Sequence, residues 1–246
     1  MKITKFCLGN DLGAVFLSYG GRNRQKVAKK VILCYKWKKV TVKRGASMNR
    51  VEILEKLRNF AAEGMKNNDP SHDFSHIQRV VSLSLRLADE LPRADLFLTE
   101  AIALLHDVCD DKLAFCNATE GIEKLLQELE IPKDEQKFIL DGIGSISFRK
   151  QPKLPKDAPI EVQIVQDADR IDAIGAVGVA RAFAFSGHKG YPVGTAEPGS
   201  TIRHFEEKLL LLYDLLNTEA ARKLAARRAE FLQLFYREFL TEIGEG

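Results

Sequence analysis

The most informative stretch of this chain reads Leu104-Leu105-His106-Asp107-Val108. The histidine and the aspartate end an apolar run that has the spacing of a helix. A folded helix with this pattern delivers its last polar residues into a pocket rather than onto open surface. We therefore expect His106 and Asp107 to lie at the centre of the protein's chemistry.

Apolar residues recur three and four positions apart from Met48 onward, with little of the alternation that is typical of strands. This periodicity predicts an all-α fold. A cap at Ser75 or Asp73 is expected to begin the second helix, which runs to about residue 91. The other helices are expected over residues 51–62, 94–106, 117–131, 134–146, 160–172, 201–216 and 219–243. The Gly- and Pro-rich residues 186–199 predict a long loop, and such loops are often functional.

Charge divides the chain into two parts. Residues 1–47 hold twelve Lys and Arg and a single acid, whereas residues 48–246 hold 25 Lys and Arg and 33 Asp and Glu. We expect residues 1–47 to be a basic N-terminal extension and residues 48–246 to be the working domain. Because Met48 stands where the composition changes, the extension either precedes the biological start or is a disordered or hairpin appendage. A basic arm that anchors the body to RNA or another polyanion is the functional alternative.

Composition also predicts where the protein works. The four cysteines have neither CxxC spacing nor the density of a disulfide scaffold, so we expect free thiols and a reducing compartment. No segment reaches the roughly 20 apolar residues that a membrane-spanning helix needs. We expect a cytoplasmic protein with no membrane partner.

Histidine and aspartate recur on three of the expected helices. His76 lies in the first turn of one helix, His106 and Asp107 end the next, and residues 167–172 read Asp-Ala-Asp-Arg-Ile-Asp. Imidazole and carboxylate ligands together suit Mn, Fe, Co, Ni or Zn, whereas an all-oxygen site suits Mg or Ca. Asp169 and Asp172 are three residues apart and share a helix face, so either can complete a four-ligand site.

The order of these motifs resembles the HD-domain superfamily of metal-dependent phosphohydrolases. The chain is most similar to the bacterial group with the pattern His-Asp-x-x-His-x-x-Arg-Val, here residues 72–80, followed by Gln-Asp-Ala-Asp-Arg-Ile-Asp-Ala-Ile-Gly at residues 166–175. The resemblance covers about residues 51–243. It implies a compact multi-helix bundle with the metal site between helices.

The resemblance also implies residue roles. The metal ligands would be His76, His106, Asp107 and Asp169, with Asp172 in reserve. They would hold one divalent ion, for which we expect Mn, with Co, Ni, Fe, Zn or Mg as alternatives.

Further residues are expected to act beside the metal. Asp107 and the pair His72 and Asp73 are the predicted catalytic residues, because the pair would lie near the substrate or behind the ligands. The residues expected to contact the substrate at the pocket mouth are Lys112, Arg149, Lys189, His188 and His204.

The expected reaction is hydrolysis of a nucleotide by metal-activated water. Within the similar group, the implied reaction releases pyrophosphate from nucleoside or deoxynucleoside triphosphates. The alternatives are a 5′-nucleotidase or phosphodiesterase of the same superfamily and a nucleotide sensor without turnover. We expect a small phosphorylated partner, no nucleic acid, and a monomer or homodimer.

Overall fold

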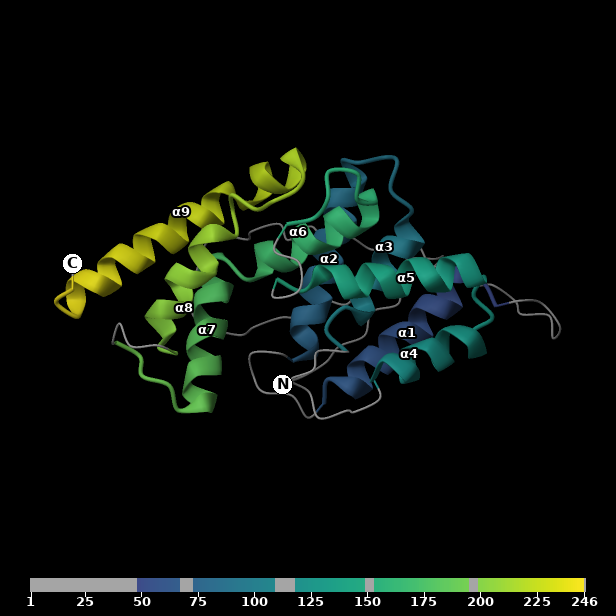
Figure 1. Cartoon of the computed structure of the whole chain (residues 1–246), viewed down its shortest axis with the longest axis horizontal. Helices are drawn as coiled ribbons and strands as arrows, with labels where there is room; N and C mark the ends of the chain where they lie inside the picture. Colours follow the sequence, from purple (N-terminus) through teal and green to yellow (C-terminus); the bar gives the residue numbers. More distant parts are fainter. Residues whose placement is uncertain (1–47, 67–72, 109–117, 149–152, 195–198, 246) are drawn as a thin grey trace, which may run out of the picture. The chain divides into compact units, whose positions relative to one another are not determined.

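The computed structural model describes residues 48–66, 73–108, 118–148, 153–194 and 199–245. Within these ranges every regular element is a helix and no strand occurs, so the predicted all-α class is confirmed (Figure 1). The elements are α1 (Arg50–Gly64), α2 (Phe74–Asp89), α3 (Leu96–Leu105), α4 (Ala118–Glu128), α5 (Lys133–Ile146), α6 (Ile160–Asp172), α7 (Gly175–Lys189), α8 (Thr201–Glu207), the 3-10 turn η1 (Leu209–Leu211) and α9 (Glu219–Glu242). The predicted extension over residues 1–47 lies outside the described residues.

Helix α2 illustrates why these segments are helical. Asp73 caps its start, because the Asp73 carboxylate accepts a hydrogen bond from the backbone N–H of His76 at 3.3 Å. Ile77, Val80, Ser84 and Leu87 follow three and four residues apart and are buried. This stripe packs α2 between α3 and α6.

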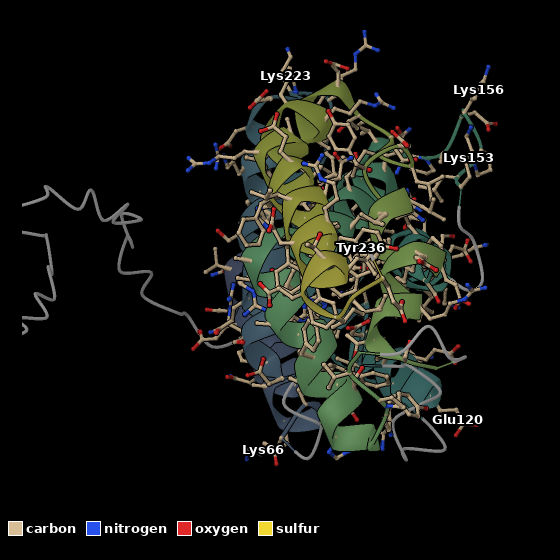
Figure 2. The ribbon with its side chains drawn as sticks, turned by 90° about the vertical axis from the view of Figure 1, so that its left-hand side faces the viewer. Lys66, Glu120, Lys153, Lys156, Lys223 and Tyr236 are labelled. Carbon is tan, nitrogen blue, oxygen red and sulfur yellow. The ribbon has the colours of Figure 1, made fainter. Side chains whose placement is uncertain are left out.

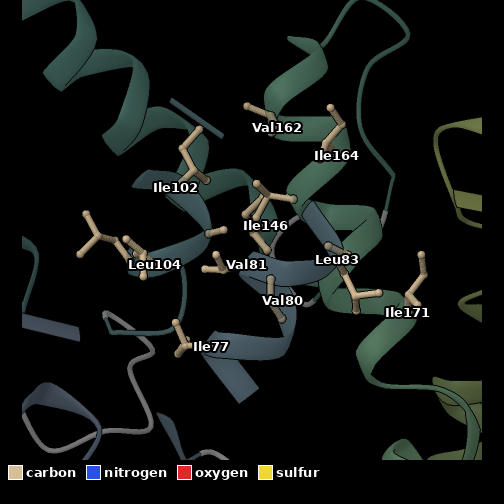
Figure 3. Close-up of a cluster of buried hydrophobic side chains, with 14 of the residues drawn as sticks. Ile77, Val80, Val81, Leu83, Ile102, Leu104, Ile146, Val162, Ile164 and Ile171 are labelled. Atoms are coloured by element: carbon tan, nitrogen blue, oxygen red, sulfur yellow. The ribbon is translucent and has the colours of Figure 1, made fainter. Parts of the chain in front are cut away.

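The core around α2 is drawn in Figure 3. Ile77 and Val80 of α2 lie with Ile102 of α3, Ile146 of α5 and Ile164 of α6 in one buried cluster. Burying each such side chain stabilises the fold by about 1.5–3 kcal/mol. The cluster fixes the relative positions of α2, α3 and α6, which carry all the metal-ligand candidates.

Helix α7 corrects the sequence prediction, which placed no helix between residues 172 and 201 and a loop over residues 186–199. The three glycines within α7, Gly175, Gly178 and Gly187, lower helix propensity and resemble turns in the sequence. One of them is required by packing, since a Cβ at Gly178 would lie 2.1 Å from the carbonyl oxygen of Ala173. The helix ends at Gly190, whose positive φ of 69° gives a left-handed cap.

The segment predicted as one helix over residues 201–216 is also different. Helix α8 ends at Glu207 and is followed by η1. The backbone of Lys208 leaves helical geometry, with φ −138° and ψ −63°. The break allows Leu209, Leu212 and Leu216 to be buried together in the core.

Candidate metal centre

Two buried imidazoles face each other where α2 and α3 meet. His76 lies in the first turn of α2 and His106 caps the end of α3. Their ring centroids are 5.4 Å apart. The Nε2 atoms of both rings are buried and have no hydrogen-bond partner within the described ranges. An unsatisfied buried nitrogen costs about 1–3 kcal/mol, so two at one place indicate a ligand site.

One carboxylate from the turn after α3 and one from α6 approach the same nitrogens. Asp107 Oδ2 lies 3.2 Å from His76 Nε2, and Asp107 Oδ1 lies 3.6 Å from His106 Nε2. Asp169 Oδ1, on α6, lies 3.5 Å and 4.0 Å from the same two nitrogens. One ligand atom each from His76, His106 and Asp107 can be chosen within 4.8 Å of one another. These separations suit one ion that binds each ligand at about 2.0–2.2 Å.

The site is closed on one side and open on the other. The histidine side chains are 1% exposed, whereas those of Asp107 and Asp169 are 23% and 30% exposed. A bound ion would therefore be reached from the carboxylate side. A catalytic metal site needs such an open position for water or substrate.

The Nδ1 atom of each histidine, on the side of the ring away from the candidate ion position, lies within hydrogen-bond distance of an oxygen. His76 Nδ1 lies 2.8 Å from Asp172 Oδ2, and His106 Nδ1 lies 2.9 Å from the carbonyl oxygen of Ala103. Asp172, the reserve ligand candidate, thus lies on the Nδ1 side of His76, away from Nε2. Asp169 is the carboxylate of α6 that faces Nε2.

The charges at the centre shift two pKa values. Burial alone would lower the pKa of His76, but the carboxylates of Asp107 and Asp172 outweigh burial and raise it to about 9. Burial alone would raise the pKa of Asp172, but contacts with His76, Arg79 and Arg181 hold it well below its usual value. Without an ion, both ring nitrogens of His76 are therefore protonated at neutral pH, and the imidazole is positively charged.

Several predicted site residues have other positions or lie outside the described residues. Asp73 is the cap of α2 and also accepts a hydrogen bond from Ser75 Oγ at 2.5 Å. His188 and Lys189 lie in the last turn of α7 rather than in the predicted loop, and both are exposed. His204 is exposed on α8, whose cap is Ser200. The predicted residues outside the described ranges are His72, Lys112 and Arg149.

A groove that the sequence pattern did not predict lies between α2 and α7. It has a volume of about 380 Å³ and is open to solvent. Its lining residues are Asp73, Ser75, Arg79, Ala176, Val177, Ala180, Arg181 and Ala184. Ala176, Ala180 and Ala184 are four residues apart, and this spacing is the feature of the sequence that could have predicted the helix face.

Comparisons with known proteins show the family of this chain. The family model described as "HD domain" matches residues 73–174, which include α2, α3 and α6. YpgQ of Bacillus subtilis (strain 168) is 37% identical over 200 residues, which are 80% of this chain and 96% of that protein. The chain therefore belongs to the HD-domain superfamily of hydrolases.

Solved structures give the same relationship. The crystal structure of Bacillus subtilis YpgQ superimposes with a TM-score of 0.68 and is 35% identical in sequence. The match covers 80% of this chain and 98% of the YpgQ chain. A second YpgQ structure is a complex with ADP, with a TM-score of 0.64, 35% identity, and coverage of 77% and 97%. An HD-superfamily hydrolase from Bacillus thuringiensis has a TM-score of 0.61 at 34% identity and covers 80% of this chain and all of its own.

In the part of the chain that the structure describes, no helix combines the length and the apolar character needed to cross a membrane.

Proposed function

We propose that this protein is a divalent-metal-dependent phosphohydrolase that releases pyrophosphate from nucleoside or deoxynucleoside triphosphates. One observation carries the proposal. The buried Nε2 atoms of His76 and His106 have no hydrogen-bond partner in the described chain, and the partly exposed carboxylates of Asp107 and Asp169 lie close to them. The ADP complex of YpgQ supports a nucleotide as the substrate.

The donor set fits a divalent transition-metal ion. We propose His76, His106, Asp107 and Asp169 as its ligands and Mn²⁺ as the ion, since mixed imidazole and carboxylate ligands suit this group of metals. Such an ion polarises a phosphoryl oxygen and lowers the pKa of bound water toward neutrality.

The chain's own residues would prepare this chemistry. The buried imidazoles close the rear of the site, so the triphosphate would approach from the side of Asp107 and Asp169. Asp107 would also accept a proton from the attacking water, and we retain His72 and Asp73 as proposed catalytic residues. The proposed contacts with the substrate remain Lys112, Arg149, Lys189, His188 and His204.

The proposal is tested by turnover of the purified full chain. Nucleoside mono-, di- and triphosphates and a phosphodiester are each incubated with Mn²⁺, Co²⁺, Ni²⁺ or Mg²⁺, and pyrophosphate and orthophosphate are scored separately. Pyrophosphate from triphosphates is the expected result. Orthophosphate from monophosphates would replace the proposal by a 5′-nucleotidase, and cleavage of the diester would replace it by a phosphodiesterase. Nucleotide binding without any product would replace it by a sensor.

The ligand role is tested with His106→Ala. We expect turnover and metal retention to fall by more than the roughly 10- to 100-fold that is typical of residues behind the ligands. Far-ultraviolet circular dichroism should change little, because His106 ends α3 rather than forming its interior. His188→Ala, at an exposed histidine, should keep the ion. Full metal retention in His106→Ala would remove His106 from the site.

A further inference from the structure

We propose that Asp172 is a positioning residue of the metal centre. It would hold His76 in the tautomer that carries its proton on Nδ1 and presents the Nε2 lone pair to the ion. Arg79 and Arg181 would hold Asp172 in place for this task. The inference rests on the proposed function, because it presumes that His76 binds a metal.

Every polar group that contacts the Asp172 carboxylate is able to donate a hydrogen bond. Its Oδ2 accepts from Arg181 Nη1 at 2.8 Å and from Arg79 Nη2 at 3.1 Å, and it lies 2.8 Å from His76 Nδ1. Its Oδ1 accepts from Arg79 Nε at 2.7 Å. The Asp172 side chain is only 1% exposed. An ionised carboxylate, which can only accept, satisfies all four contacts.

The two arginines explain how a buried carboxylate is tolerated here. An unpaired buried carboxylate costs several kcal/mol, and paired guanidinium groups offset that cost. Arg79 donates to both oxygens of Asp172 in a bidentate arrangement, which fixes the orientation of the carboxylate. Asp172 therefore cannot rotate freely, and its Oδ2 stays opposite His76 Nδ1.

The contact joins three helices. His76 and Arg79 belong to α2, Asp172 ends α6, and Arg181 belongs to α7. Helix α7 supplies no proposed metal ligand, yet through Arg181 it would help to orient one. This gives Arg79 and Arg181 a role at the metal centre without contact with the ion.

His106 provides an internal comparison. Its Nδ1 faces the backbone carbonyl of Ala103, which can only accept, so its proton is fixed on Nδ1 by the main chain. The tautomer of His76 depends instead on a side chain that can be replaced. A change at Asp172 should therefore affect His76 and leave His106 unchanged.

The decisive variant is Asp172→Asn. The arginines would retain the amide oxygen, so the amide NH₂ would face His76 Nδ1 and move the imidazole proton to Nε2. We expect the dissociation constant for Zn²⁺, measured by competition with a chromogenic chelator, to rise about 10- to 100-fold. Long-range ¹H–¹⁵N NMR of the two metal-free proteins above pH 9, where His76 has lost its second proton, should show the remaining proton on Nδ1 in the wild type and on Nε2 in the variant. His106 should keep its Nδ1 proton in both proteins.

Asp167→Asn is the matched control, because it removes another buried carboxylate of α6 that contacts Asn217 and Thr218 instead of the metal centre. It should lower stability and leave the zinc dissociation constant unchanged. If Asp172→Asn does not fold, Arg181→Gln replaces it. Loss of one of the two arginines that hold Asp172 should weaken zinc binding, by less than the roughly 10- to 100-fold expected for Asp172→Asn.

The outcomes separate the two proposals. If the wild type binds neither Mn²⁺ nor Zn²⁺, the proposed function fails, and the inference fails with it. If the wild type binds zinc and the folded Asp172→Asn variant binds it equally well, or keeps the His76 proton on Nδ1, only the positioning role of Asp172 is overturned. An unchanged zinc affinity in Arg181→Gln, where that variant is the one that folds, overturns it likewise.

Discussion

His76 is almost fully buried, yet three carboxylates lie within 3.5 Å of its ring nitrogens. Asp107 and Asp169 face Nε2, and Asp172 faces Nδ1. Desolvation disfavours a charged imidazole, but Asp107 and Asp172 outweigh it and raise the pKa of His76 to about 9. A metal ion would take the place of the proton on Nε2, since both neutralise the same carboxylates.

This raised pKa predicts how the stability of the metal-free protein depends on pH. A group whose pKa is higher in the folded state stabilises the fold while it is protonated. The stabilisation from His76 should be complete below the unfolded value of 6.5 and should disappear as the pH rises through about 9. Thermal unfolding of EDTA-treated protein between pH 6 and pH 10 measures this loss.

His76→Gln is the reference for that measurement, because other groups also titrate at high pH. The difference in melting temperature between wild type and variant should shrink from pH 6.5 to pH 9 and beyond. A difference that stays constant or grows over this range would contradict the charged state inferred for His76.

At the element scale, α6 presents carboxylates to two different neighbours. Asp169 and Asp172 face α2, whereas Asp167 faces the start of α9. Asp167 Oδ1 accepts from the backbone and side-chain nitrogens of Asn217, and Oδ2 accepts from the backbone nitrogen and hydroxyl of Thr218. Thr218 in turn caps α9. Asp167 thus joins α9 to the helix that carries the metal-ligand candidate Asp169.

Asp167→Asn should reduce the free energy of unfolding by about 1–3 kcal/mol. The amide NH₂ would meet donors of Asn217 or Thr218 and leave buried groups unsatisfied. Burial raises the pKa of Asp167, so part of the cost of its charge is relieved in the variant. Urea unfolding at pH 7 provides the measurement, and a variant as stable as the wild type would show that these hydrogen bonds contribute no net stability.

Helix α7 depends on a close approach that only glycine allows. In Gly178→Ala the new methyl group would lie 2.1 Å from the Ala173 carbonyl oxygen, so the backbone must shift. We expect a loss of about 1–3 kcal/mol in the free energy of unfolding. Gly187→Ala is the control on the same helix, because a Cβ there meets nothing within 4 Å, and it should gain up to about 1 kcal/mol. Equal stabilities of the two variants in urea unfolding would contradict this account.

The basic residues of α9 are less uniform than the sequence indicates. Their clustering predicts one solvated face, and Lys223 does point outward (Figure 2). Arg222 and Arg228 instead donate to the carbonyl oxygens of Leu216 and Ile171, at 2.5 Å and 2.7 Å. The same residue types therefore serve as surface charge and as contacts between elements.

At the scale of the described domain, the central helices hold the site and the C-terminal helices support it. Helices α2, α3 and α6 share one core and carry the ligand candidates. Helix α9 packs against α6 and α7. Asp167 and Arg228 bond across these contacts, so the domain from Met48 onward should act as one cooperative unit.

Deleting residues 1–47 tests this division of the chain. We expect the remaining protein to keep its helical circular dichroism, its metal affinity and its turnover, because every ligand candidate lies from residue 76 onward. Loss of folding on deletion would make the extension part of the domain. If the arm anchors the protein to a polyanion, salt-sensitive RNA binding by the full chain should disappear with the deletion.

The sequence by itself determined that the body is helical and that His76, His106, Asp107 and an aspartate of residues 167–172 are the ligand candidates. These conclusions follow from local spacing and residue chemistry, which do not require knowledge of packing. Local spacing gave a wrong prediction at α7. Its glycines resemble turns in the sequence, but they lie in a helix, where the close approach of Gly178 to Ala173 requires a glycine.

Only the tertiary structure decided which of the two aspartates on one face of α6 approaches Nε2 of His76. Helical spacing alone does not separate Asp169 from Asp172, and only the family resemblance favoured Asp169. In the structure, Asp172 meets the opposite nitrogen of a histidine 96 positions away. The distinction depends on how α2, α6 and α7 pack, because packing sets which edge of the imidazole each carboxylate reaches and brings Arg79 and Arg181 to Asp172.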